Sequence, residues 1–312
     1  MTSRTEIRIS CRRHDWTEAL FDGRVREPGF ALRPDAHLPL SALVDPAPAL
    51  DFMECGMMTF VQAAADDGLP ILALPIFIRA AFRHSYIFVN ANSGIESPRD
   101  LEGRRVGTRY EMTANVWARA LLRDEYGVRL EKIRWVQQTG NRDGTRFKLP
   151  PDTAMEMVGP DVDLQDWLAA GKIDALIHPD ILPLKLLSRG PVRRLFADAA
   201  AEERKSYARI GIVPVMNVIA FRRAEEPASV RRVFDTFARA KEAGLDAMED
   251  NRASGLLWYW KAWEDQVALL GRDPVPYSLA KMRPTVDAFI GHAVAQGLLE
   301  KPVPAASLFA DL

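Results

Sequence analysis

Apolar and polar residues follow two different periods along the chain, and this predicts interleaved strands and helices. Short apolar runs typical of strands occur at residues 6–11, 69–78, 84–90, 104–108, 133–138 and 174–179. Helical spacing predicts a helix over residues 114–127, where Val116, Ala120 and Leu121 recur on one face. Residues 51–68 are interpreted as a turn that enters a helix ending at Gly68.

The predicted order from residue 103 to residue 177 is strand, helix, strand, helix, strand. This order builds a parallel sheet with helices on both faces. After about residue 225 the pattern is helical, with amphipathic stretches at residues 227–249, 254–271 and 283–299. The sequence therefore predicts an α/β protein with extra C-terminal helices.

Chain length favours two lobes, because 312 residues exceed what one hydrophobic core normally organises. No low-complexity linker separates them, so we expect ordinary strands to join the lobes, with a ligand cleft between them. The predicted division places residues 1–90 and 215–312 in the first lobe and residues 91–214 in the second.

Composition excludes several classes of protein. Apolar residues make up 48% and charged residues 27%, as in soluble globular proteins, and the formal net charge is -1. No overall field therefore favours nucleic acid or a membrane surface as partner. The N-terminus lacks a secretory apolar core, and Cys11 and Cys55 are expected to be reduced thiols, so the predicted location is the cytoplasm.

Several blocks of sequence resemble one family in the same order. They are "FRHSYIFVN", "YEMTANVWARALL", "GKIDALIHP", "VRRLFAD" and "GIVPVMNV". The chain resembles the 4,5-dihydroxyphthalate decarboxylase family from about residue 6 to residue 245, and less closely beyond. The resemblance implies the two-lobed fold of type 2 periplasmic binding proteins and a small aromatic acid as substrate. Two positions depart from the family pattern: Asn217, where the family has His, and Glu111, where it has Gln.

Loss of CO2 from a hydroxylated ring needs a base, a proton donor and cationic anchors in a dry site. His84 is predicted as the acid/base, because its ordinary pKa lies near neutrality. The alternative is a histidine that packs at the start of a strand. Arg79 and Arg83 are predicted to bind substrate carboxylates through their planar guanidinium groups, and an ordinary surface or ion-paired arginine is the alternative for each.

A second group of candidates precedes the helix at residues 114–127. Glu111 is predicted to orient His84 or accept a phenolic proton, although a first-turn acid is also favoured by the helix dipole alone. Thr113 is predicted to donate to a carboxylate at the helix start, or to serve as a plain N-cap. The other predicted substrate-binding residues are Ser85, Tyr110, His178 and Asn217.

The sequence thus predicts a carbon–carbon lyase that converts 4,5-dihydroxyphthalate to protocatechuate, with no metal ligands and no cofactor. A divalent metal at Glu54, His84, Glu111 and His178 is a minority alternative, since no local HxxxH or HxH spacing supports it. A homo-oligomer is expected. The alternatives in function are a small-acid binding protein without chemistry, and a lyase or hydrolase on a related non-phthalate acid.

Overall fold

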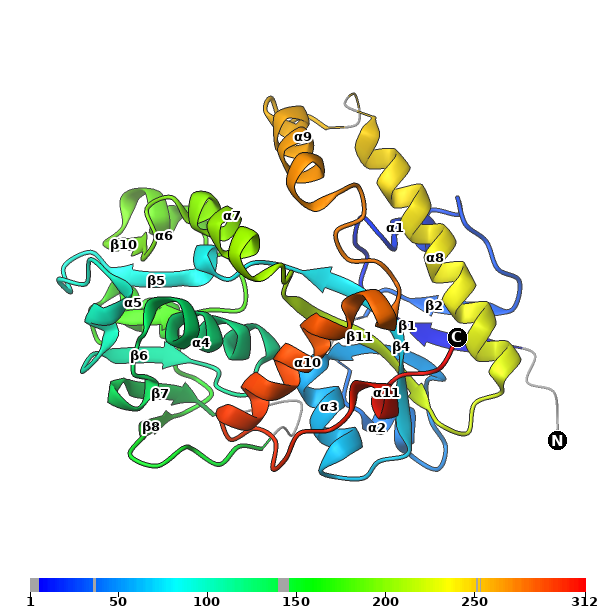
Figure 1. Cartoon of the computed structure of the whole chain (residues 1–312), viewed down its shortest axis with the longest axis horizontal. Helices are drawn as coiled ribbons and strands as arrows, with labels where there is room; N and C mark the ends of the chain where they lie inside the picture. The colour runs from blue at the N-terminus through cyan, green and yellow to red at the C-terminus, as the bar shows by residue number, and fades with distance from the viewer. Residues whose placement is uncertain (1–5, 36–37, 140–145, 251, 253) are drawn as a thin grey trace. The chain divides into compact units, whose positions relative to one another are not determined.

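The computed structural model describes residues 6–35, 38–139, 146–250, 252 and 254–312. The chain folds into two compact units (Figure 1). The first unit comprises Met1–Ala80, Val215–Val286 and Val303–Leu312, and the second comprises Ala81–Pro214 and Asp287–Pro302. The chain therefore passes between the units four times. No helix in these residues is long and apolar enough to span a membrane.

This division differs from the predicted one in two segments, residues 81–90 and residues 287–302. The first crossing falls after Ala80 and not after residue 90, because β5 (Ile87–Asn90) pairs with strands of the second unit. Residues 287–302 return to the second unit because they complete its core. There the ring of Phe289 lies 5.5 Å from that of Trp117.

The first unit contains a five-stranded sheet. Its strands, in spatial order, are β2 (Phe30–Arg33), β1 (Ile7–Ser10), β3 (Phe52–Gly56), β11 (Val215–Arg222) and β4 (Ile71–Ala80). β1 runs parallel to β2 and β3, whereas β11 is antiparallel to β3 and β4. Its helices are α1 (Glu18–Phe21), α2 (Ser41–Val44), α3 (Met57–Ala65), α8 (Pro227–Glu249), α9 (Tyr259–Leu270) and α11 (Ala305–Leu308), and α10 (Leu279–Ala295) begins in this unit.

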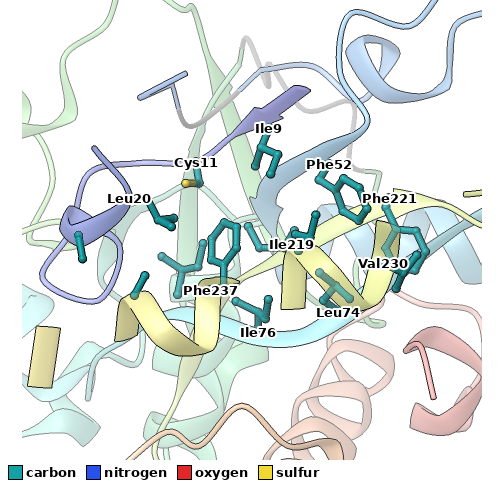
Figure 2. Close-up of a cluster of buried hydrophobic side chains, with 14 residues drawn as sticks. Ile9, Cys11, Leu20, Phe52, Leu74, Ile76, Ile219, Phe221, Val230 and Phe237 are labelled. Atoms are coloured by element: carbon teal, nitrogen blue, oxygen red, sulfur yellow. The ribbon is translucent and has the colours of Figure 1, made fainter. Parts of the chain in front are cut away.

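The core of the first unit lies where α8 covers the sheet. Figure 2 shows Phe237 of α8 among Ile76 of β4 and Ile219 of β11, and all three side chains are fully buried. Burial of this kind stabilises a fold by about 1.5–3 kcal/mol for each large apolar side chain. The sequence missed β3 in this core: its first four residues are all buried, so no alternation marked it as a strand.

The second unit contains a six-stranded sheet. Its strands, in spatial order, are β10 (Val192–Arg194), β5, β9 (Ala175–Ile177), β6 (Arg105–Thr108), β7 (Arg134–Gln138) and β8 (Ala154–Val158). Its α-helices are α4 (Thr113–Tyr126), α5 (Leu164–Ala169), α6 (Leu184–Arg189) and α7 (Ala199–Ile210), and its 3-10 helices are η1 (His84–Tyr86), η2 (Pro98–Leu101) and η3 (Leu130–Lys132). β6 is parallel to β7 and to β9, which confirms the predicted strand–helix–strand unit.

Candidate functional site

The most polar edge of the second unit's sheet is the one where its parallel strands end. β6, β7, β8 and β9 run in one direction, so their carboxyl ends meet there, and β5 begins there because it is antiparallel to β9. In open α/β sheets this edge is where ligands bind. The side chains placed there by strand ends are Arg109, Tyr110, Glu111, Gln137, Gln138 and His178, which we call the carboxyl-edge cluster.

Arg109 carries the cationic charge of this cluster. Its Nε and Nη2 donate to the side-chain oxygen of Gln138, at 3.1 and 2.7 Å. Gln138 in turn donates to the carbonyl oxygen of Pro160, at 3.2 Å, so the pair is fixed to the loop after β8. Among the described residues no carboxylate forms an ion pair with Arg109. Its positive charge is therefore held in place by a neutral partner and is left for an anion.

Glu111 is a buried carboxyl group held by Gln137. The Nε2 of Gln137 donates to Glu111 Oε2 at 2.7 Å, while the Oε1 of Gln137 accepts from the backbone N–H of Tyr110 at 2.6 Å. Burial raises the pKa of Glu111, and the hydrogen bonds and the charges of Arg109 and Arg119 oppose this rise without cancelling it. The group therefore keeps a proton to higher pH than an ordinary glutamate.

His178 follows β9 and is only partly buried. Its Nδ1 lies 2.8 Å from the carbonyl oxygen and 3.1 Å from the backbone nitrogen of Asp180. Burial lowers the pKa of His178, and the positive charges of Arg109 and Arg83 act in the same direction. The imidazole is therefore neutral near pH 7 and able to accept a proton.

Arg83 acts as a brace for this loop. Its Nη2 donates to the carbonyl oxygens of His178 and Pro179, at 2.8 and 3.1 Å, and its guanidinium stacks 3.7 Å from the ring centre of Tyr86. The side chain is 1% exposed. Arg83, which was predicted to bind a substrate carboxylate, thus uses one guanidinium nitrogen to position the loop that carries His178.

Three further predicted site residues, Ser85, Tyr110 and Thr113, lie within the second unit. Ser85 donates from its N–H and its hydroxyl to Glu203 Oε1, at 3.2 and 2.9 Å. The hydroxyl of Tyr110 donates to the carbonyl oxygen of Gln296 at 3.1 Å, and the ring is buried beneath Arg119. Thr113 is the first residue of α4 and follows Glu111 closely, so it lies next to the carboxyl-edge cluster.

His84 does not join this cluster. Its ring lies 5.0 Å from that of Phe196 and 6.0 Å from that of Tyr126, on the side of α4 and α7. No hydrogen bond among the described residues links it to Glu111, so the predicted orientation of His84 by Glu111 is not found. Burial lowers the pKa of His84 to about 4. Its backbone precedes β5 as expected, and it lies in the short 3-10 helix η1.

Arg79 and Asn217 belong to the first unit. They are paired residues of β4 and β11, and Asn217 also pairs with Gly56 at the end of β3. A second polar set lies at this edge: Arg12 donates from its backbone N–H and Nε to the two carboxylate oxygens of buried Glu54, at 2.8 and 2.6 Å. His14 is close to both groups, and burial lowers its pKa.

Sequence reasoning missed Arg109, Gln137 and Gln138 as site residues. Each stands at or just after the end of a predicted strand, which was the available signal. In the first unit, Arg12 directly follows the strand predicted at residues 6–11 and carried the same signal, whereas Glu54 was considered only as a possible metal ligand. Within the described part of the chain, no group of three or more His, Cys, Asp or Glu side chains is arranged to hold a metal ion.

Comparisons with known proteins first identify the class of fold. Residues 47–175 match the family model of the periplasmic substrate-binding protein of phosphonate ABC transporters. The periplasmic aliphatic sulphonate binding protein SsuA of Escherichia coli superposes with a TM-score of 0.54 at 18% identity, over 99% of this chain and 93% of its own. The chain therefore has the two-lobed α/β fold of the periplasmic binding proteins, as predicted.

Within that class the sequence points to particular relatives. It is 29% identical to a 4,5-dihydroxyphthalate decarboxylase of Comamonas testosteroni, over 98% of this chain and 97% of the relative. It is 35% identical to a protein of the same name from Pseudomonas putida, over 41% of this chain and 52% of that protein. The predicted resemblance to the 4,5-dihydroxyphthalate decarboxylases is confirmed.

Proposed function

We propose that this protein decarboxylates 4,5-dihydroxyphthalate to protocatechuate. The observation that carries the proposal is the similarity to a 4,5-dihydroxyphthalate decarboxylase over nearly the whole of both chains. The fold by itself supports binding of a small molecule, because folds do not fix function. The chemistry must therefore be assigned to residues, and the carboxyl-edge cluster supplies the groups it requires.

Arg109 binds the carboxylate that stays on the ring. The substrate carries two carboxylates, and Arg109 is a cation held by the neutral Gln138 and not by an acid. A guanidinium presents two parallel donors to a carboxylate, so it fixes the orientation of the ring as well as its position. The start of α4 at Thr113 adds a hydroxyl and a helix N-terminus, which also favour an anion.

His178 takes the proton of the ring hydroxyl para to the leaving carboxylate. Its imidazole is neutral because burial lowers its pKa, so it is free to accept this proton. Loss of the proton raises the electron density on the carbon that bears the carboxylate. That carbon is then ready to be protonated.

Glu111 delivers a proton to this carbon. Burial raises the pKa of its carboxyl group, which therefore holds a proton to higher pH than an ordinary glutamate does, and the amide of Gln137 fixes its orientation. Protonation forms a C–H bond at the ring carbon. The bond to the carboxylate then breaks, CO2 leaves, and the bonding electrons restore the aromatic ring. His178 returns its proton to the phenolate oxygen of the product, and solvent reprotonates Glu111, so one proton is consumed for each CO2 released.

His84 is assigned no step in this scheme, because its ring lies outside the carboxyl-edge cluster. The cytoplasmic location, the homo-oligomer and the absence of a cofactor stay predictions. Exposed apolar residues at the start of α9, Leu257 and Trp258, support an association of chains, and size-exclusion chromatography with light scattering tests it.

The test of the function is release of CO2 by the purified protein from a panel of hydroxylated phthalates and benzoates. We expect turnover of 4,5-dihydroxyphthalate, with protocatechuate as product, and the same rate after dialysis against a chelator. Tight binding of one acid without CO2 release from any of them would contradict the proposal and favour a binding protein. Turnover of a different acid alone would show that 4,5-dihydroxyphthalate is not the substrate. The departures from the family pattern at Glu111 and Asn217 allow this outcome.

A further inference from the structure

A pocket lies within the second unit. Its volume is about 320 Å³, and it is bounded by η1, α4, α7 and the C-terminal part of α10. Its walls are mostly apolar and include Trp117, Leu121, Ile210, Ile212 and Ala288. This volume lies at the lower end of the range found for small-molecule sites, roughly 300–1,000 Å³. None of Arg109, Glu111 and His178 lines it.

His84 supplies the polar group of this pocket. The side chain is 1% exposed, yet neither ring nitrogen has a hydrogen-bond partner among the described residues. Buried polar groups are rarely left in this state. A neutral imidazole offers one donor and one acceptor, so a single hydroxyl group on a ligand could satisfy one nitrogen and a second polar atom or water the other.

The charged groups that line the pocket are already paired. Glu125 accepts from Ser206 at 2.7 Å and forms an ion pair with Arg209. Asp124 pairs with Arg123 and lies 3.6 Å from the Nδ1 of His292. Arg83 donates to the carbonyl oxygen of His178. The carboxylates of the pocket are therefore compensated, and its mostly apolar walls favour an uncharged guest.

We propose that this pocket binds a small uncharged phenol, with the ring against Trp117 and Leu121 and the hydroxyl hydrogen-bonded to His84. The aromatic walls suit a planar ring. The hydroxyl meets a buried imidazole whose two nitrogens have no hydrogen-bond partner among the described residues. This site is distinct from the carboxyl-edge cluster and takes a ligand of a different charge from the proposed dianionic substrate.

The test measures binding of phenol to the full-length protein by calorimetry, with toluene and benzoate as matched probes. We expect phenol to bind about tenfold more tightly than toluene, which lacks the hydroxyl, and benzoate to bind most weakly. This comparison needs no variant. Equal affinity for phenol and toluene, tighter binding of benzoate, or no binding of phenol would overturn the proposal.

Two variants then locate the site. His84→Leu should weaken phenol about tenfold and leave toluene within a few-fold, whereas His84→Gln, which keeps a donor and an acceptor, should retain phenol. Circular dichroism checks that both variants are folded. Arg109→Gln is the matched control at the other site and should not change phenol affinity. If Arg109→Gln loses phenol binding, or if folded His84→Leu protein binds phenol as tightly as the wild type, the phenol binds elsewhere. Turnover is not measured, so failure here is independent of the proposed decarboxylation.

Discussion

The side-chain amide of Gln137 donates to Glu111 at 2.7 Å while its oxygen accepts from the backbone of the preceding residue, Tyr110. One side chain at the end of β7 thus fixes both the turn after β6 and the carboxyl group that this turn carries. An amide is suited to this, because its donor and acceptor ends point in different directions. The orientation of Glu111 therefore depends on the pairing of two neighbouring strands.

The Glu111→Gln variant should lose most of its turnover, by about 10²–10⁴-fold, because the amide cannot donate a proton as a carboxylic acid does. Burial raises the pKa of Glu111 above the ordinary value of 4.5 for a glutamate. The acid is protonated below this raised pKa, so the wild-type rate should fall as the pH rises through it. The pH profile of kcat measures this limb, which should be absent from the variant.

The same variant gives a readout in stability. The folded protein holds the Glu111 proton to higher pH than the unfolded chain does, so this group's contribution to stability is present at low pH and is lost as the pH rises. Urea unfolding should show a smaller pH dependence for Glu111→Gln. The variant also carries the residue of the family pattern, and full turnover in it would mean that the proton comes from elsewhere.

The Arg109→Gln variant should bind 4,5-dihydroxyphthalate about 10- to 100-fold more weakly, since a charge-assisted hydrogen bond contributes about 1.5–3 kcal/mol. Arg109→Lys should recover part of this loss, because it keeps the charge without the planar fork. Fluorescence or calorimetric titration gives the Kd. Arg105→Gln is the matched control, because Arg105 begins the same strand and pairs with Glu156 on the surface. A similar loss in both variants would mean that Arg109 has no particular role.

The His178→Gln variant should lower kcat by about 100-fold or more while substrate affinity changes little, because glutamine cannot remove the phenolic proton. Burial lowers the pKa of His178 from 6.5. The base works only when neutral, so the wild-type rate should fall as the pH drops through this lowered pKa. Steady-state kinetics across the acid range checks this limb. If the rate of the variant still falls at low pH in the same way, another group is responsible for this limb.

The Arg119→Leu variant should destabilise the protein by roughly 2–5 kcal/mol. Arg119 is fully buried, and it donates to the Oε1 of Gln296 at 2.8 Å and to the carbonyl oxygen of Tyr110 at 2.7 Å, both of which would lose this partner. Urea unfolding followed by circular dichroism measures the change. Arg123→Leu, one turn further along α4 in a surface pair with Asp124, should cost less than about 1 kcal/mol. Equal effects would contradict the assigned role.

The sequence predicted much of the fold because alternating periods mark strands and helices directly. The strands β6, β7 and β9 and the helix α4 lie within two residues of their expected bounds, whereas β8 was not predicted. β3 was missed because it is buried throughout, and the boundary at residue 90 was wrong because the hydrogen-bonding partner of β5 lies far along the chain. Long-range pairing leaves no local pattern.

The candidate site was predicted in part for the same reason. Glu111 and His178 were both predicted as site residues, and the structure places each of them after a parallel strand of one sheet. The sequence placed His84 with Glu111, but the ring of His84 packs near Phe196 and Tyr126, residues that are far from it in the sequence. Nor could the neutral partner of Arg109 be foreseen, since Gln138 lies on a neighbouring strand.

Gln296 constrains when the second unit can finish folding during synthesis. This residue completes the burial of Arg119 and Tyr110, yet it follows Pro214 by 82 residues. At about 5–20 residues per second, a ribosome needs roughly 4–16 s to reach it. During that interval the Nε of Arg119 lacks the acceptor that it has in the folded unit. The packing around Arg119 can therefore be completed only after the ribosome has passed Gln296.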